Sequence, residues 1–150
     1  KVAIYKRIAS FDSLEEIPEM EDELVDRYGD LPAPVNNLLA VAKIRVLAGK
    51  LKIKSISLVS NHLRLLLHPG QTLAGEDLVA AGSHYPNRVK YSVAGEEFEI
   101  KLRLPGKGQP EAKYLLEELE AFLNILGGSR YKSPQAEESP AVATESNINI

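Results

Sequence analysis

The sequence contains no cysteine, which excludes disulfide bonds and thiolate chemistry and agrees with a reducing compartment. It also has no window that approaches the roughly 20 apolar residues of a membrane-spanning helix, and no signal peptide opens the chain. We therefore expect a cytoplasmic protein without a membrane partner.

Groups that carry out catalysis or bind metals are scarce. The only histidines are His62, His68 and His84, and no cluster of Cys, Asp or Glu beside them completes a metal shell. The loop Gly106-Lys107-Gly108 lacks the spacing of a phosphate-binding loop, and Gln109 stands where Ser or Thr would bind magnesium. A nucleophile elbow and a dinucleotide fingerprint are absent as well. We therefore expect no catalytic activity, no metal and no cofactor in this chain.

A strong positive charge is also missing. The formal net charge is −3. The stretch 134–150 contains Glu137, Glu138 and Glu145 but no lysine or arginine, so it accounts for −3 by itself and residues 1–133 are neutral. A neutral domain lacks the positive field of an autonomous DNA-binding domain.

The pattern of apolar residues predicts an α+β fold, with helices packed on an antiparallel sheet of two hairpins. The expected order is helix-helix-helix-hairpin-helix-hairpin-helix. The expected elements are helices over 2–8, 14–28 and 34–51, strands over 55–59 and 63–67, a helix from 75 to about 81, strands over 89–93 and 98–104, and a helix over 110–126. In the first hairpin we expect Asn61 to take a positive φ.

We predict one domain over residues 1–129, followed by a flexible tail over 130–150. The tail consists mainly of Ser, Ala, Glu, Asn and Pro, which cannot bury enough apolar surface to offset the entropy lost on ordering. Because the chain does not begin with Met and enters helical sequence at once, we expect it to be a fragment of a larger protein.

The second helix has the most specific local pattern. Ser13 and Glu16 have the spacing of a capping box, whereas Pro18 predicts a kink or a restart near Ile17. Gly29 is expected to end the helix in a left-handed conformation. The predicted buried stripe of this helix consists of Ile17, Met20, Leu24, Val25 and Tyr28.

Two acidic residues of this helix are candidates for binding a partner. Glu23 and Asp26 are three residues apart, so their carboxylates project from the same face. Asp26 lies near the helix C-terminus, where the helix dipole disfavours an anion. The alternative is that Arg27, four residues after Glu23, closes an ordinary intrahelical ion pair.

The basic residues concentrate in one segment. Lys43, Arg45, Lys50, Lys52 and Lys54 follow each other closely, without the aromatic residues on which bases would stack. We interpret this segment as a solvated face, with weak contact to phosphates as the alternative.

The first 55 or so residues contain two motifs that resemble the C-terminal domain of Mfd, the bacterial transcription-repair coupling factor family (TRCF). One is the run Ile4-Tyr5-Lys6-Arg7-Ile8-Ala9-Ser10. The other extends from Glu23 to Leu39 and follows the pattern ELxDR[FY]GxLPxxVxxLL. Beyond them the resemblance extends to about Ser129 in the order of elements only.

The resemblance implies a regulatory, autoinhibitory domain of an ATP-dependent DNA translocase that acts in transcription-coupled DNA repair. Such a domain docks on the UvrB-like N-terminal module of the same chain and masks the surface that UvrA binds. The parent protein would also bind RNA polymerase, and DNA through motor domains that hold ATP and Mg and are missing here.

By the same resemblance, Glu23 and Asp26 are the docking residues. Structural support for their face would come from the surrounding residues Leu24, Val25, Arg27, Tyr28 and Gly29. Two other functions remain open at this point: an accessory nucleic-acid contact module that uses the segment from Lys43 to Lys54, and a small-molecule-binding α+β enzyme.

Overall fold

The computed structural model describes residues 15–128. The predicted helix over 2–8, the Ser13 end of the capping box and the tail over 130–150 lie outside these residues. In order, the described elements are α2 (Glu16–Tyr28), α3 (Ala33–Lys50), β1 (Ile53–Val59), β2 (His62–Leu67), α4 (Gly75–His84), β3 (Val89–Ala94), β4 (Glu97–Arg103) and α5 (Ala112–Leu126).

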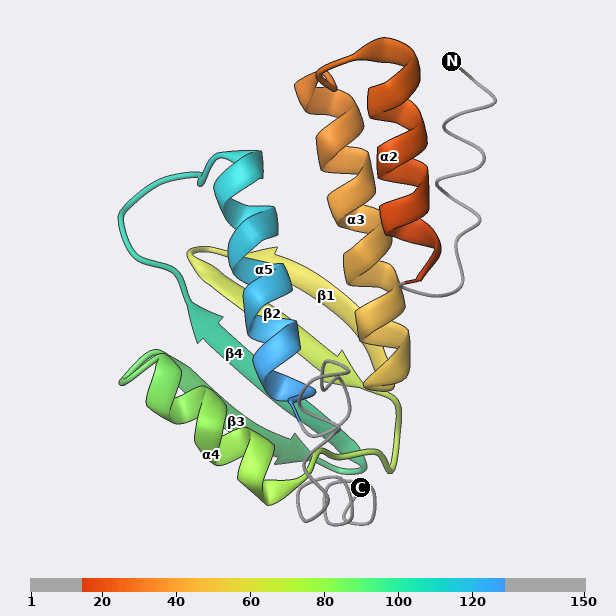
Figure 1. Cartoon of the computed structure of the whole chain (residues 1–150). Helices are drawn as coiled ribbons and strands as arrows, with labels where there is room; N and C mark the ends of the chain where they lie inside the picture. Colours follow the sequence, from red (N-terminus) through yellow and green to blue (C-terminus); the bar gives the residue numbers. More distant parts are fainter. Residues whose placement is uncertain (1–14, 129–150) are drawn as a thin grey trace.

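The chain has the predicted α+β architecture. Its four strands form one antiparallel sheet in the order β1-β2-β4-β3, so each hairpin contributes an inner and an outer strand. Figure 1 shows α5 lying across one face of this sheet, with α3 and α4 on either side of it.

The strict alternation of β2 and β4 decides which side chains meet α5. Leu63, Leu65 and Leu67 of β2 are buried, as are Ile100 and Leu102 of β4. Because side chains alternate between the two faces of a strand, the residues between them lie on the opposite face, where no described helix is packed.

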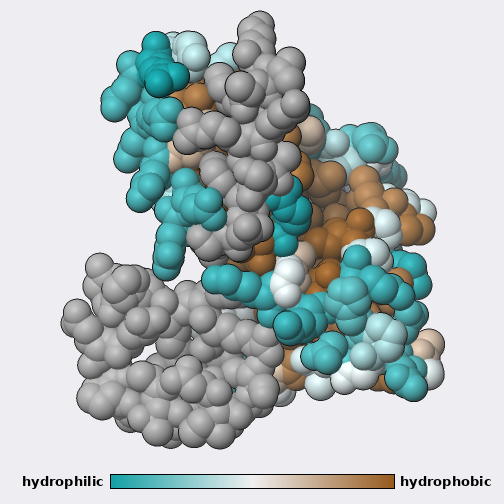
Figure 2. All heavy atoms as spheres, turned by 90° about the vertical axis from the view of Figure 1, so that its right-hand side faces the viewer, coloured by the Kyte–Doolittle hydropathy of each residue, from teal (hydrophilic) through white to brown (hydrophobic). Residues whose placement is uncertain are grey.

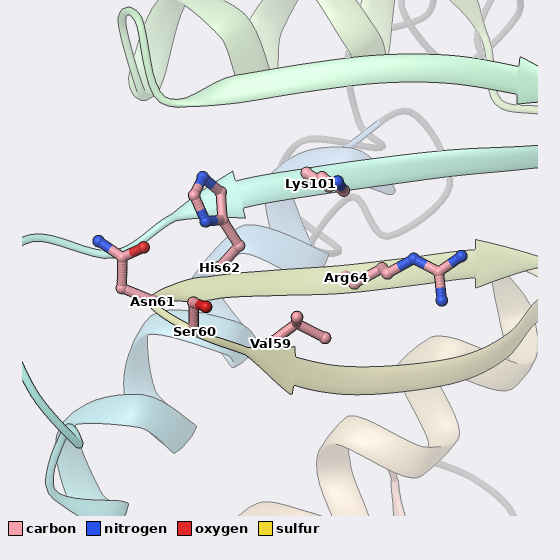
Figure 3. A pocket seen from close by; sticks show the side chains of 6 residues that line it. All are labelled: Val59, Ser60, Asn61, His62, Arg64 and Lys101. Atoms are coloured by element: carbon pink, nitrogen blue, oxygen red, sulfur yellow. The ribbon is translucent and has the colours of Figure 1, made fainter.

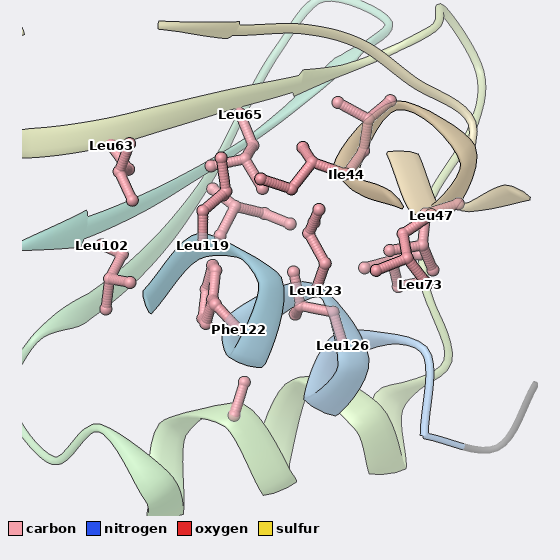
Figure 4. Close-up of a cluster of buried hydrophobic side chains, with 14 of the residues drawn as sticks. Ile44, Leu47, Leu63, Leu65, Leu73, Leu102, Leu119, Phe122, Leu123 and Leu126 are labelled. Atoms are coloured by element: carbon pink, nitrogen blue, oxygen red, sulfur yellow. The ribbon is translucent and has the colours of Figure 1, made fainter. Parts of the chain in front are cut away.

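The main hydrophobic cluster fills the space between the sheet and the helices (Figure 4). α5 contributes Leu119, Phe122, Leu123 and Leu126 to it. These residues repeat at the three- and four-residue spacing of a single helix face, and the helix ends at Gly127 as its sequence predicts.

A second, smaller cluster joins α2 to the N-terminal half of α3. It consists of Ile17, Met20 and Leu24 on α2 and Leu39 and Ala42 on α3. Ile44 and Leu47, further along α3, belong to the main cluster. α3 is apolar over much of its circumference because one end packs against α2 and the other end packs in the main cluster beneath the sheet.

The start of α2 and the first hairpin bear on two local predictions. Within the described residues the helix begins at Glu16, next to Ile17, which puts Pro18 in its first turn, where a missing N–H costs no helical hydrogen bond. The turn predicted before it starts at Leu14, outside these residues. In the first hairpin the prediction is wrong, because Ser60 has the positive φ (56°) and Asn61 does not.

Candidate docking site

The predicted docking residues lie on the solvent side of α2. The buried residues Ile17, Met20 and Leu24 attach one side of the helix to α3 (Figure 1). A second series at three- and four-residue spacing carries acids and lies away from that seam. This acidic ridge consists of Glu16, Glu19, Glu23 and Asp26.

The two predicted docking residues differ in their surroundings. Glu23 and Arg27 form an i,i+4 ion pair with a separation of 4.0 Å between Oε2 and the guanidinium NH2 nitrogen, and Glu23 has at least one further interaction. Asp26 is exposed, and within residues 15–128 no salt bridge involves its carboxylate. The intrahelical pair that the sequence offered as an alternative is therefore present for Glu23 and leaves Asp26 outside it.

The residues expected to support this face lie in different environments. Leu24 is 3% exposed, but Val25 and Tyr28 are 47% and 59% exposed, so their assignment to the buried stripe is wrong. Gly29 caps the helix by donating from its N–H to the carbonyl oxygen of Val25 over 2.8 Å. Its φ of 75° has the predicted sign, but its ψ of −146° differs from that of a left-handed helical residue.

Exposed apolar side chains accompany the charges on this side of the molecule. Figure 2, which views the right-hand side of Figure 1, shows brown hydrophobic surface next to teal hydrophilic surface. The large apolar side chains that α2 and α3 expose are Val25, Tyr28 and Val41. At about 100° per residue, Val25 and Tyr28 lie on the other flank of the buried seam from the acidic ridge. A partner that docks on the ridge would thus meet mainly carboxylates.

The basic segment from Lys43 to Lys54 does not form one cationic surface. Lys43 Nζ lies 3.6 Å from Glu21 Oε1 on α2, and Lys54 Nζ lies 2.5 Å from Glu97 Oε2 at the start of β4. The Lys54 side chain donates a hydrogen bond to Glu97 and so lowers the pKa of that carboxyl. These two lysines connect separate elements of the domain.

Sequence reasoning missed a different group of cations, on the open face of the sheet. The register aligns Arg64 of β2 with Lys101 of β4, and Lys101 with Lys90 of β3. The next row on this face pairs His62 with Arg103. The alternation in β4 places Lys101 and Arg103 on one face, but the registers of both the β2–β4 and the β3–β4 pairs are needed to bring all these residues together.

Arg64 also has an acidic partner on this face. Its Nε donates to Glu99 Oε2, and Ser92 Oγ donates to Glu99 Oε1 over 3.1 Å. These hydrogen bonds, that from Arg64 above all, lower the pKa of Glu99. The carboxylate form is therefore favoured in the folded protein.

The ion pair predicts a pH dependence of stability. Because the folded pKa of Glu99 lies below its ordinary value, the contribution of the pair is present above that value and is lost as the pH falls through the folded pKa. Replacing Glu99 by glutamine should lower the free energy of unfolding at pH 7 by about 1 kcal/mol or less and make its decline below about pH 4.5 less steep. Urea unfolding at several pH values measures both effects.

A suitable control is Glu96→Gln on the neighbouring turn. It removes the same charge, and the described part of the chain offers the Glu96 carboxylate no salt bridge. If the free energy of unfolding falls as steeply at low pH in Glu99→Gln as in the parent, the pH dependence does not come from Glu99.

The histidines and other metal-binding residue types remain dispersed in the fold. Within residues 15–128, no group of three or more His, Cys, Asp or Glu side chains is arranged to hold a metal ion. Nor do the described helices include one with the length and apolarity needed to cross a membrane.

Comparison with known proteins agrees with the sequence resemblance. The family model "TRCF domain" matches residues 1–78. The transcription-repair-coupling factor of Bacillus subtilis is 27% identical over 113 residues, which cover 74% of this chain and 10% of that protein. The factor of Rickettsia typhi is 30% identical over 116 residues (77% of this chain, 10% of that protein). That of Escherichia coli is 43% identical over 56 residues (37% and 5%).

A solved structure supports the fold. The crystal structure of the C-terminal domain of transcription-repair coupling factor superposes with a TM-score of 0.70 at 22% identity, covering 84% of this chain and 78% of that one. The chain spans about a tenth of the length of the Bacillus and Rickettsia relatives. Since the family model accounts for more than half of the 150 residues, this chain belongs to the TRCF domain family of transcription-repair-coupling factors.

Proposed function

We propose that this chain is the regulatory domain of an ATP-dependent DNA translocase in transcription-coupled repair, and that its α2 docks on the UvrB-like N-terminal module of the same polypeptide. In the docked state it masks the surface that UvrA binds and restrains the motor. The observation that carries the proposal is the acidic ridge of α2, with Asp26 exposed near the end of the helix.

The energetics of such a ridge suit a reversible latch. Exposed ion pairs contribute about 0–1 kcal/mol each, so Glu23 and Asp26 together would favour docking by no more than about 2 kcal/mol. A contact of this strength holds a closed state that the binding of another partner, such as RNA polymerase, can still open.

Catalysis is assigned to other parts of the longer protein. The sequence has no phosphate-binding loop of the P-loop type, so we place ATP, Mg and the main DNA contacts in motor domains outside this chain. Nucleic-acid contact through the Lys43–Lys54 segment has less support, because Lys43 and Lys54 pair with acids of the same domain.

The test replaces both docking acids, Glu23→Ala with Asp26→Ala, in the full-length protein. Loss of up to about 2 kcal/mol of docking energy should raise the population of the open state about 5- to 30-fold. We therefore expect higher ATPase activity and tighter UvrA binding, measured by steady-state hydrolysis and by titration with purified UvrA.

The matched control is Glu96→Ala with Glu117→Ala, which removes two exposed carboxylates from other elements. This control should retain the low ATPase activity and weak UvrA binding of the parent. If the docking double mutant behaves like the control while its fold is intact by circular dichroism, the latch is rejected.

A further inference from the structure

The open face of the sheet has a separation of charge along its strands. At the end near the β1–β2 turn, two adjacent rows carry Arg64, Lys101 and Lys90, then His62 and Arg103. The acids of this face lie nearer the other end. They are Glu99, bound by Arg64, and Glu97, bound by Lys54.

Two lysines of this face oppose each other directly. Lys90 on β3 and Lys101 on β4 are register partners, and like charges in that position destabilise a sheet. Both are exposed, and no salt bridge joins either of them to a carboxylate among residues 15–128. The direct pairing of the two lysines is unfavourable in itself, while Lys101 also attracts the neighbouring Glu99 carboxylate and helps to lower its pKa.

A hollow lies beside Lys101 on this face. It has a volume of about 460 Å³ and is lined by Val59, Ser60, Asn61, His62, Arg64 and Lys101. Figure 3 shows the labelled residues of β2 and β4 in front of the sheet, with α5 behind it. The hollow thus offers amide and hydroxyl groups next to Arg64 and Lys101, and it opens on the face where no helix among residues 15–128 is packed.

The spacing of the cations suits a chain of phosphates. Neighbouring strands are about 4.8 Å apart, and alternate residues on one strand are about 6.7 Å apart. Arg64, Lys101, Lys90 and Arg103 in these rows therefore place their positive charges within roughly 10 Å of each other across the strands. Arg, Lys, Ser and Asn side chains are the groups that contact phosphate oxygens in protein–nucleic acid interfaces.

The same face lacks the groups that dominate tight protein interfaces. The centre of such an interface is desolvated and enriched in aromatic residues. The aromatic residues of the sheet, Tyr91 and Phe98, are partly buried against the main cluster, and Tyr91 aligns with the buried Ile100, so they lie on the other side. Without aromatic groups on the open face, it also cannot stack the bases of a single strand.

From this arrangement we propose that the open face of the sheet binds the phosphate backbone of duplex nucleic acid, with Lys90 and Lys101 at its centre and no reading of base sequence. This surface is separate from the acidic ridge of α2 and from the Lys43–Lys54 segment. It contacts nucleic acid electrostatically, in addition to the docking proposed for α2.

The test measures fluorescence anisotropy of a labelled DNA duplex of arbitrary sequence, titrated with the 150-residue chain at several salt concentrations. Lys90→Gln with Lys101→Gln should weaken binding about tenfold at low salt, and should reduce the slope of log K against log salt by about 2, since each phosphate contact contributes about 0.9. The thermal midpoint of this variant should be unchanged or higher, because the like-charge pair is gone.

The matched control is Lys52→Gln with Lys113→Gln. It removes two exposed lysines, one just before β1 at the end of the sheet away from the hollow and one on α5. This variant should bind within about twofold of the parent. Absence of duplex binding by the parent at the lowest salt, or equal binding by the two double variants, overturns the proposal.

A second probe distinguishes nucleic acid from an acidic protein segment. Poly-L-glutamate of similar length is titrated against the same variants. If it binds with the same dependence on Lys90 and Lys101 while the duplex does not bind, the surface is a docking site for an acidic polypeptide and the proposal is wrong. This result would leave the docking of α2 untouched, since that experiment uses other residues and other measurements.

Discussion

Phe122→Ala is expected to cause the largest loss of stability, lowering the free energy of unfolding by about 3–5 kcal/mol. The ring of Phe122 is fully buried in the main cluster. It packs edge-to-face on Tyr85, with ring centroids 5.3 Å apart, an arrangement that adds to the energy of burial. Alanine would leave a cavity under the sheet that α5 can close only in part.

The loss should propagate to the groups around Tyr85. The guanidinium of Arg88 lies 5.1 Å above the Tyr85 ring, and its NH2 nitrogen donates to Glu118 over 2.8 Å. Burial raises the pKa of Tyr85, and a looser environment should bring it back toward its ordinary value. Urea unfolding measures the stability, and ultraviolet titration measures the ionisation of the tyrosines.

Val93→Ala is the matched control for Phe122→Ala, because Val93 is exposed on β3. It should change the free energy of unfolding by no more than about 0.5 kcal/mol. If Phe122→Ala costs as little as this control, the cluster between α5 and the sheet is not the main source of stability.

Leu24→Ala is expected to cause the second large loss of stability, about 2–4 kcal/mol. This loss should be confined to the attachment of α2 to α3. Leu24 is one of only three α2 residues in the small cluster with α3, and no residue of α2 belongs to the main cluster. Truncation should therefore loosen α2 while the sheet stays folded. Hydrogen exchange should speed up in the amides of α2 and remain slow in β2 and β4.

Val25→Ala is the control for this experiment, since Val25 is the next residue and is half exposed. It should leave exchange in α2 close to that of the parent. Equal acceleration of exchange in α2 and in the sheet of Leu24→Ala would show that the two clusters unfold as one unit. In the full-length protein, Leu24→Ala should also weaken docking, because the acidic ridge would no longer be held in place.

Local patterns predicted most elements of the fold. The apolar residues of α5 recur with the period of a helix and those of β4 with the period of a strand. The structure confirms the predicted helix and the predicted strand. The order of the strands in the sheet could not be predicted from local patterns, because the paired residues of β2 and β4 are more than thirty positions apart in the sequence. Periodicity alone does not choose between the possible orders of two hairpins.

The errors on α2 have a physical reason. Periodicity identifies apolar positions but not how many neighbours a helix has. α2 packs on α3 alone within residues 15–128, so the buried stripe is narrow and excludes Val25 and Tyr28. The acids of the ridge lie on one helix, so their spacing in the sequence is enough to place them on one side. The cations of the sheet face lie on three strands, and only the strand register shows that they are neighbours.

α3 enters both hydrophobic clusters, and this has a mechanical consequence. Leu39 and Ala42 attach it to α2, while Ile44 and Leu47 attach it to the body that contains the sheet. A force applied to α2 along its axis would act in shear on the small cluster between α2 and α3. α3 would transmit the same force to the main cluster. The weaker joint should fail first, releasing α2 while the rest of the domain stays folded.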